Sequence, residues 1–541
     1  MRWLTILATA LFVLSANGWS ASANAQESLP GESVSAALED LLSSEAEAAV
    51  EGGAAADVSA LRQFYAARDF DPLWTGDAIR QERAVEVLEI IQSAEREGLL
   101  PDHYGATSLT EQATSTTSAG KAAFELNLSR AFIRYGQAIH AGQTDPTLVN
   151  DEVRVVPPNV APETLLFAAG NNAFPADVLR SLAPAGGEYQ RLRAALAEYR
   201  ALAAAGGWPQ IDEGETLRPG DEDPRVEQVR ARLAVTGELA AWRAEGGPLF
   251  DSGLFLAVRE FQSRHGLEQD GIIGPMTLTA LNVTAEQRVN QMVLNMERRR
   301  WMGPLEGRRY IFVNLADFQL KLVSNGKTIH TARTVVGAPY HRTPVFTEDM
   351  TYLVINPNWH VPSSIARNEL LPKAQEDPTY LAANNFAVLD ADGTPVPMTR
   401  INWNALDASN LPYRFRQGPG DGNALGRVKF MLPNEYNIYL HDTPSKSLFG
   451  RSVRAFSHGC VRVQDPFDLA EVILADQGWS RSRIDAANQA GDRLVVTLKD
   501  PIPVYISYIT AWANKDGTVH FRDDIYGRDA TLADAILGVG S

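Results

Sequence analysis

The sequence predicts a multidomain α+β protein that is helical over its first half and mostly β over its second. A chain of 541 residues is long enough for roughly three or four domains. Apolar residues recur at helical spacing over 56–212 and again over 213–283. From Tyr310 onward the apolar period changes to two, which is typical of strands. Helical units should therefore precede a mostly β domain.

The composition is that of a globular protein, with 45% hydrophobic and 21% charged residues. The formal net charge is -17. A field of this sign argues against binding nucleic acid or anionic lipid through overall charge. It does not exclude a polar polymer that is recognised by local contacts.

The first residues predict a secretory signal peptide over 1–25. Arg2 gives a positive start, and the apolar run over 4–14 is too short to span a bilayer comfortably. Ala23-Asn24-Ala25 is a small-x-small cleavage site, so the mature chain would begin at Gln26 and be exported. The alternative is an uncleaved membrane anchor, and membrane contact is expected only in that case.

The segment 26–55 is rich in Ala, Glu, Ser and Gly, which predicts a flexible tether with a weak helix over 34–50 at most. Helical spacing begins with 61–68, and Pro72 ends that helix. A long helix over 123–140 has Gly142 just past its end. We expect surface and capping roles, rather than metal binding, for four polar residues of this region: Asp102, His103, His140 and Asp145.

The segment 213–283 reads as a separate small unit of three helices. Asp270-Gly271 predicts a turn, and Pro275 suits the first turn of the last helix. A connecting helix follows over 284–308. Its end carries the basic run Arg298-Arg299-Arg300, which we interpret as favourable charge at a helix C-terminus on a solvated face.

The β pattern covers 309–510 and is interrupted once. Asn325-Gly326 predicts a tight hairpin between two strands. The pattern stops over 363–412, where a helix and loops are expected, and resumes afterwards. The remaining residues, 511–541, form a C-terminal tail.

Cys460 is the only cysteine, and it lies in Ser457-His458-Gly459-Cys460-Val461-Arg462. A single cysteine makes no intramolecular disulfide and is a weak metal site, so it is either a nucleophile or an incidental buried thiol. A nucleophile needs a base, because a free thiol with a pKa of about 8.5 is only a few per cent thiolate at neutral pH. His458 and His441 both qualify by position.

His441, a spacer of fifteen residues and then Ser457 to Arg462 resemble the signature of L,D-transpeptidases with the YkuD-type fold. The resemblance extends along the chain. It implies a mostly β catalytic sandwich with a lid insertion at about 363–412. It also implies a helical scaffold domain over 56–212 and a small three-helix peptidoglycan-binding module over 213–283. Without the resemblance, the last unit is only a small helical bundle.

The resemblance makes Cys460 the nucleophile and His441 the base, and strand geometry agrees. In an extended chain, the Cβ atoms of His458 and Cys460 are about 6.6 Å apart, whereas a histidine on a neighbouring strand can come closer. His458 then shapes the pocket. The backbone N–H groups of Gly459 and Cys460 are candidate donors to an oxyanion.

The remaining candidate side chains have an ordinary structural alternative each. Tyr439 is a pocket residue or an ordinary strand tyrosine, and Ser457 belongs to the same pocket group. Arg462 binds a substrate carboxylate or holds its loop. Trp359 and Asn358 line the cleft or, for Trp359, pack in the core. Asp442 follows His441 directly and points away on a strand, so we expect a turn residue rather than a triad acid.

The implied substrate is peptidoglycan, with tetrapeptide stems as donor and acceptor. Cys460 would attack the carbonyl at the L-centre of diaminopimelate, expel the terminal D-alanine and pass the acyl group to a second stem as a 3-3 cross-link. Water or a protein amine as acceptor would give a carboxypeptidase or an anchoring enzyme instead. Carbapenem-type β-lactams are the expected acylating inhibitors, and the expected location is the periplasm, at the cell wall.

No cofactor and no metal are expected, and no nucleic acid is an expected partner. Two other classes stay open. One is a non-catalytic wall-binding protein that retains the fold. The other is a zinc hydrolase that uses His441, His458 and Asp442, although the chain shows no His-x-x-x-His spacing near them.

Overall fold

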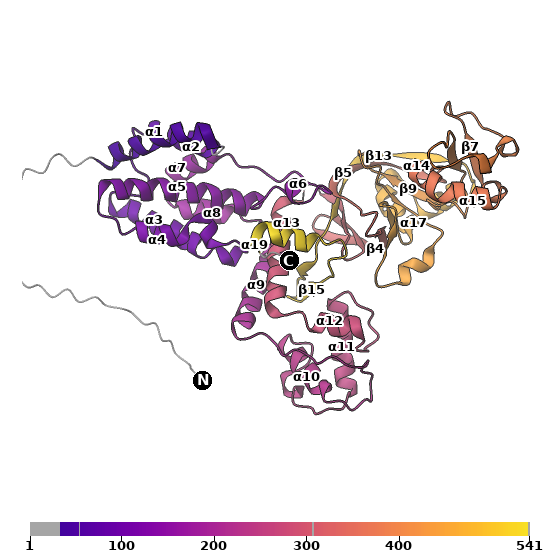
Figure 1. Ribbon diagram of the computed structural model, residues 1–541, viewed down its shortest axis with the longest axis horizontal. Coiled ribbons are helices and arrows are strands. Elements are labelled where there is room, and N and C mark those ends of the chain that lie inside the picture. Colours follow the sequence, from indigo (N-terminus) through magenta and orange to yellow (C-terminus); the bar gives the residue numbers. More distant parts are fainter. Residues whose placement is uncertain (1–32, 53–54, 306–307, 539–541) are drawn as a thin grey trace, which may run out of the picture.

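The computed structural model describes residues 33–52, 55–305 and 308–538. The predicted signal peptide and its cleavage site lie outside the described residues, as does the start of the predicted tether. Within the described ranges, no helix is long and apolar enough to cross a membrane. A helical domain lies at one end of the molecule and a β domain at the other, and a small helical unit hangs beside their junction (Figure 1).

The helical domain is built around one long central helix, α5. Its apolar core includes Trp74, Phe132 and Leu166, all of which are fully buried. Thr117 caps the start of α5, and Gly142 ends it as predicted. The helices of this half are α1 (Val34–Gly52), α2 (Ala55–Ala66), α3 (Ala78–Gln92), α4 (Ala106–Gln112), α5 (Ser118–Ala141), α6 (Pro146–Val149), α7 (Pro162–Asn171), α8 (Pro175–Leu182) and α9 (Gly187–Ala204).

Two elements of this half differ from the prediction. The tether expected over 26–55 is a packed helix over most of its described part, because Leu38 and Leu42 of α1 are buried in the core of the helical domain. Helix α9 was expected in the scaffold domain, yet Tyr189 and Leu196 belong to the core of the β domain. Both differences have one cause: a short apolar stripe does not specify which neighbour will cover it.

The small unit has the three predicted helices, α10 (Arg225–Val235), α11 (Ser252–Arg264) and α12 (Pro275–Leu281). Pro275 opens α12 as expected, behind Gly274 at the N-cap. Its core is separate from the other cores and includes Val229, Val258 and Phe261.

Helix α13 (Ala285–Trp301) connects the parts, and the predicted solvated face at its end is wrong. Arg298, Arg299 and Arg300 are all buried. Arg300 forms an ion pair of 2.7 Å with Glu297, with both side chains fully buried, and Arg298 forms an ion pair with Asp529 of the tail. The helix is enclosed because α9, the tail and the sheet pack around it. The sequence of α13 alone does not predict these neighbours.

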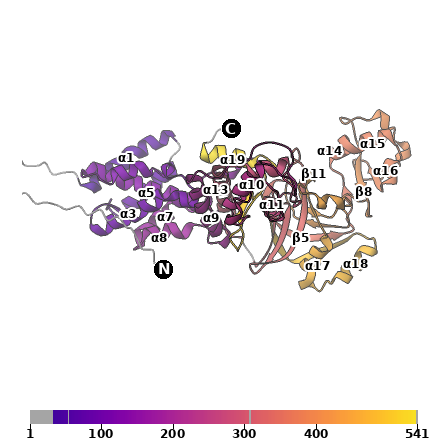
Figure 2. The same ribbon diagram turned by 90° about the horizontal axis from the view of Figure 1, so that it is seen from below.

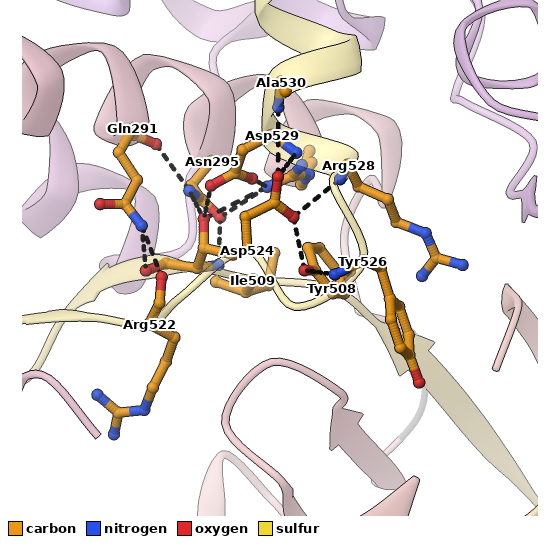
Figure 3. Close-up of polar contacts among 12 residues, drawn as sticks. Gln291, Asn295, Tyr508, Ile509, Arg522, Asp524, Tyr526, Arg528, Asp529 and Ala530 are labelled. Atoms are coloured by element: carbon orange, nitrogen blue, oxygen red, sulfur yellow. Dashed lines mark hydrogen bonds and ion pairs between the residues drawn. The ribbon is translucent and has the colours of Figure 1, made fainter. Parts of the chain in front are cut away.

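Figure 3 shows the polar network that joins α13 to the tail. The side-chain amide of Gln291 donates to the carbonyl oxygen of Arg522 at 2.8 Å. Thr510 donates its N–H to Asn295 Oδ1 at 2.7 Å and its hydroxyl to Asp529 Oδ2 at 2.7 Å. The predicted C-terminal tail is therefore an ordered part of the junction. It comprises β14 (Ala511–Ala513), β15 (Val519–Phe521) and α19 (Arg528–Leu537).

The β domain is one sheet that closes on itself, since β5 pairs with β13 on one side and with β9 on the other. The spatial order of the strands across the sheet is β1-β5-β13-β2-β3-β4-β12-β10-β9, and the Asn325-Gly326 turn joins β3 to β4 as predicted. The strands are β1 (Val153–Arg154), β2 (Arg309–Asn314), β3 (Gln319–Ser324), β4 (Lys327–Gly337), β5 (Val345–Ile355), β9 (Val428–Met431), β10 (Leu440–His441), β11 (Ala455–Ser457), β12 (Val461–Val463) and β13 (Leu494–Ser507). Helices α17 (Pro466–Leu474) and α18 (Arg481–Gln489) follow β12.

The insertion forms a subdomain with its own core around Trp403 and Phe415, and we call it the lid. It lies at the end of the molecule opposite the helical domain in both Figure 1 and Figure 2. Its limits are wider than the predicted 363–412, because β6 and β8 pair at its base. The elements are β6 (Trp359–His360), α14 (Ser363–Ile365), the π-helix η4 (Ala366–Leu370), α15 (Leu371–Glu376), α16 (Tyr380–Ala383), β7 (Phe386–Leu389) and β8 (Arg414–Gln417).

Candidate active site

The two predicted catalytic residues lie on adjacent strands. β10 runs parallel to β12 and antiparallel to β9, with His441 opposite Arg462 on one side and Lys429 on the other. Two residue pairs earlier, Tyr439 lies beside Cys460, which directly precedes β12. Because side chains alternate along a strand, these five residues share one face of the sheet. The site is thus a cluster of titratable groups on a single face.

The turn that carries Cys460 is held by its own serine. Ser457 Oγ accepts from the Gly459 N–H at 3.1 Å and donates to the Cys460 carbonyl at 2.5 Å. Gly459 has φ of 110°, a conformation that favours glycine. The expected oxyanion donor pair needs correction, since the Gly459 N–H is already engaged. The Cys460 N–H has no hydrogen-bond partner among the described residues and remains the candidate donor.

Residues that the sequence did not single out support this turn from behind. Thr343 Oγ1 donates to the Gly459 carbonyl at 2.7 Å and accepts from the Gly337 N–H at 2.9 Å. Tyr526 donates its hydroxyl to the Gly337 carbonyl at 2.6 Å, and Arg528 donates to the Thr343 carbonyl at 3.0 Å. Tyr526 lies on the tail loop that leads into α19, and Arg528 is the first residue of that helix (Figure 3). The tail therefore reaches the catalytic turn through Thr343.

The thiol of Cys460 is protonated in this arrangement. The residue is partly buried and packs against the core of the β domain. Burial raises the pKa of the thiol to about 11, against the opposing effects of Tyr439, Lys429 and Arg462. The S–H lies 3.6 Å from the Asn437 carbonyl oxygen, a long contact for this weak donor. A base is therefore required before the sulfur can attack.

His441 has the protonation state of a base. Burial, followed by the charge of Arg462, lowers the pKa of its imidazole to about 3, so the ring is neutral at physiological pH. Nδ1 lies 2.5 Å from the carbonyl oxygen of Asp442. A carbonyl only accepts, so Nδ1 carries the proton and Nε2 keeps its lone pair. Among the described contacts Nε2 and the Cys460 sulfur are not hydrogen-bonded, as is common before substrate binds.

Asp442 contacts the His441 ring only through its backbone carbonyl oxygen, which accepts from Nδ1. Its carboxylate accepts from the Arg427 and Thr443 N–H groups and pairs with Lys446. This agrees with the expectation that Asp442 is not a triad acid. The carboxylate cannot both hold these partners and orient His441.

His458 points away from the sheet face and toward the lid. Its Nε2 lies 2.7 Å from Glu369 Oε1 in η4, and its ring is 4.8 Å from that of His341. Both members of the His458–Glu369 pair are 41% exposed. A pocket-shaping role for His458 fits this position. The zinc alternative loses its ligand set, because His441, His458 and Asp442 are directed at three different partners.

The remaining candidates divide between the pocket and the lid. Tyr439 lies beside the site, with its ring 5.6 Å from that of His441. Arg462 lies opposite His441, and its Nε is buried and unpaired among the described residues. Trp359 packs into the lid core beside Phe386, which is the structural alternative. Asn358 is half-buried in the segment between β5 and β6.

A lone thiol on the same sheet face as a neutral buried histidine has the residue types that cysteine acyl transfer needs. Comparison with family models gives the particular kind. Residues 308–505 match the L,D-transpeptidase catalytic domain, YkuD. Residues 222–281 match the "Putative peptidoglycan binding domain", and residues 59–196 match the scaffold domain. The chain therefore contains a YkuD L,D-transpeptidase catalytic domain together with a scaffold and a peptidoglycan-binding domain.

Two curated relatives are similar to parts of the chain. One, from Haemophilus influenzae, is named "Putative L,D-transpeptidase" and is 38% identical over 222 residues, 41% of this chain and 45% of the relative. The other is the N-acetylmuramoyl-L-alanine amidase CwlM of Mycobacterium tuberculosis, 39% identical over 80 residues, 14% of this chain and 20% of the relative. The chain thus spans less than half the length of either relative.

Two solved structures also align with the chain. The L,D-transpeptidase (Yku) from Stackebrandtia nassauensis has 13% identity and a TM-score of 0.21, covering 55% of this chain and 96% of its own. The L,D-transpeptidase from Xylanimonas cellulosilytica has 12% identity and a TM-score of 0.15, covering 55% and 99%. At these scores the two likenesses carry no argument.

Proposed function

We propose that this protein is an exported L,D-transpeptidase that cross-links peptidoglycan stem peptides through a thioester on Cys460. The observation that carries the proposal is the position of the only thiol on the same sheet face as His441, whose imidazole is buried and neutral. The peptidoglycan-binding domain in the same chain supports the substrate. The site of action would be the periplasm, at the cell wall.

The reaction follows from the protonation states. His441 Nε2 takes the thiol proton while the Cys460 sulfur bonds to the carbonyl carbon at the L-centre of diaminopimelate. The free Cys460 N–H stabilises the negative charge on the carbonyl oxygen. The C–N bond to the terminal D-alanine then breaks, and Nε2 returns the proton to the leaving amine. An amine of a second stem attacks the thioester, loses a proton to Nε2 and restores the thiol.

The decisive experiment incubates the full chain with purified disaccharide-tetrapeptides and analyses the products by mass spectrometry. We expect 3-3 linked dimers and free D-alanine from the parent, and neither from Cys460→Ser. Tripeptides without dimers would make water the acceptor and the protein a carboxypeptidase. A parent that yields no product with a soluble stem or an added amine would contradict acyl transfer.

Inhibition gives an independent test of the same assignment. A carbapenem should add its mass once, at Cys460, and a thiol alkylator should block the reaction. A chelator should leave the rate unchanged, since no step uses a metal. Loss of activity with the chelator alone would contradict the cysteine mechanism.

A further inference from the structure

A large groove lies where the small helical unit, the β domain and the tail meet, and we call it the junction groove. Its volume is about 980 Å³. Its lining comes from segments 263–269, 317–321, 450–456 and 512–522, together with Arg333 of β4. It is thus bounded by three parts of the chain that are far apart in sequence.

The junction groove carries cations without carboxylate partners, in a chain with a net charge of -17. Within the described ranges, no carboxylate lies within 4.0 Å of the charged groups of Lys321, Arg333 or Arg451. Arg522, by contrast, pairs with Asp317 at 2.7 Å. Unpaired cations gathered in a hollow favour an acidic ligand over the negative surface around it.

One side of the junction groove also presents an apolar ring. Phe456 is 38% exposed, and the Arg451 guanidinium lies 5.1 Å from the centre of its ring. A stacked arginine keeps its planar donors free at the edge for a carboxylate, while the ring offers contact to an apolar face of a ligand. Phe456 lies on β11, the strand that leads directly into the catalytic turn.

The walls of the junction groove are fixed to one another. His265 of the small unit stacks on Phe521 of the tail, with ring centres 5.6 Å apart. Arg264 donates to the Val519 carbonyl at 3.0 Å, and Arg522 donates to the Arg264 carbonyl at 2.9 Å. The groove is therefore formed before any ligand arrives, which lowers the entropic cost of binding.

We infer that the junction groove is a binding site for the carboxylate-bearing stem peptides of a peptidoglycan strand. This rests on the proposed function. Lys321, Arg333 and Arg451 would bind carboxylates of the stem peptides. Phe456 would pack against the part of the stem peptide that lies between those carboxylates. A neutral sugar polymer would leave the three cations unpaired, and nucleic acid is disfavoured by the overall charge. One peptidoglycan strand would thereby lie between the small unit and the β domain.

The test removes the charge from the full-length protein and measures binding to purified sacculi by pelleting, at low and at high salt. The triple variant Lys321→Gln, Arg333→Gln, Arg451→Gln should bind roughly tenfold more weakly at low salt and lose most of its salt dependence. A matched control removes three exposed cations elsewhere, Arg62→Gln, Arg96→Gln and Lys499→Gln, and should bind like the parent. Sacculus binding by the triple variant equal to that of the control would overturn the inference.

A second variant covers the case in which the triple variant is misfolded by circular dichroism. Arg333→Lys, Arg451→Lys keeps the charge and should retain most of the salt-sensitive binding. If this folded lysine variant loses the salt-sensitive binding of the parent, charge is not the cause and the inference is wrong. Carbapenem acylation of the parent reports on the proposed function separately, because absence of the Cys460 adduct contradicts that function whatever the sacculus binding shows.

Discussion

Glu125, at the centre of the helical domain, and Cys460, at the catalytic turn, are both buried polar groups, but they differ in their partners. The Glu125 carboxylate accepts from the N–H groups of Leu73, Trp74 and Thr75 and from the Tyr65 hydroxyl. These bonds oppose the effect of burial, which raises the pKa of Glu125. Both oxygens of this carboxylate accept hydrogen bonds from groups inside the helical domain.

At the catalytic turn the bonding capacity is incomplete. Arg462 Nε is buried without a partner, and the Cys460 N–H has none among the described residues. His441 Nε2 keeps a free lone pair beside a protonated thiol. A satisfied buried group holds a loop in place, whereas unsatisfied buried groups cost free energy that a substrate can recover. The comparison separates a structural polar centre from a candidate functional one.

The largest effect should come from removing the base. His441→Ala should lower the rate of Cys460 acylation by a carbapenem by about 10²–10⁴, the usual contribution of general-base catalysis. His458→Ala should cost less, since His458 faces the lid. The rates are measured by intact-mass spectrometry, with circular dichroism as the folding control. A folded His441→Ala variant at the parent rate, beside an inactive and folded His458→Ala variant, would reverse the two roles.

The opposite result is expected at the structural centre. Glu125→Ala leaves several buried N–H groups unpaired and should lower the free energy of unfolding of the helical domain by about 3–5 kcal/mol. Urea unfolding followed by tryptophan fluorescence reports this, because Trp74 is buried beside Glu125. Glu111→Ala, at an exposed position, is the control. Carbapenem acylation of the folded Glu125→Ala protein should stay at the parent rate. A large loss of acylation rate would contradict a purely structural role for Glu125.

A smaller effect should follow from the support behind the turn. Thr343→Val removes the hydroxyl that donates to the Gly459 carbonyl and should slow acylation at saturating carbapenem about tenfold, the value of one hydrogen bond. Thr343→Ser keeps the hydroxyl and should stay near the parent rate. Because the turn orients Cys460 rather than binding the ligand, the saturating rate should fall more than the apparent affinity. Equal rates for the valine and serine variants would remove Thr343 from the positioning of the nucleophile.

The smallest effect is expected for pH, because the rate of Cys460 acylation should be nearly independent of it. His441 has a pKa lowered to about 3 and Cys460 a pKa raised to about 11, so both stay neutral between these values. The acylation rate should therefore change less than about threefold from pH 5 to pH 8.5. A sigmoidal rise centred near pH 6.5, the ordinary pKa of histidine, would show that His441 titrates normally. The same lowered pKa predicts that stability falls as pH drops from about 6.5 toward 3, where the unfolded state binds a proton that the folded state excludes.

Sequence patterns were sufficient where the relevant information is local or lies in a long motif. Asn325-Gly326, Pro275 and Gly142 act within one turn, and each is found where its chemistry predicts. The pair of Cys460 and His441 was recognised because spacing and residue types are both constrained. Their place on one face of adjacent strands follows the same alternation that the sequence shows.

What the sequence alone determined was the order of the units and the helical or extended character of most segments, and it also gave the candidates for nucleophile and base. Tertiary structure alone decided which surfaces meet. The burial of Arg298 to Arg300, the use of the Gly459 N–H by Ser457 and the contact of His458 with Glu369 depend on partners that local periodicity does not encode. The physical reason is that a side chain's polarity specifies the kind of environment it needs, while the closing of the sheet and the docking of the tail specify which residue supplies it.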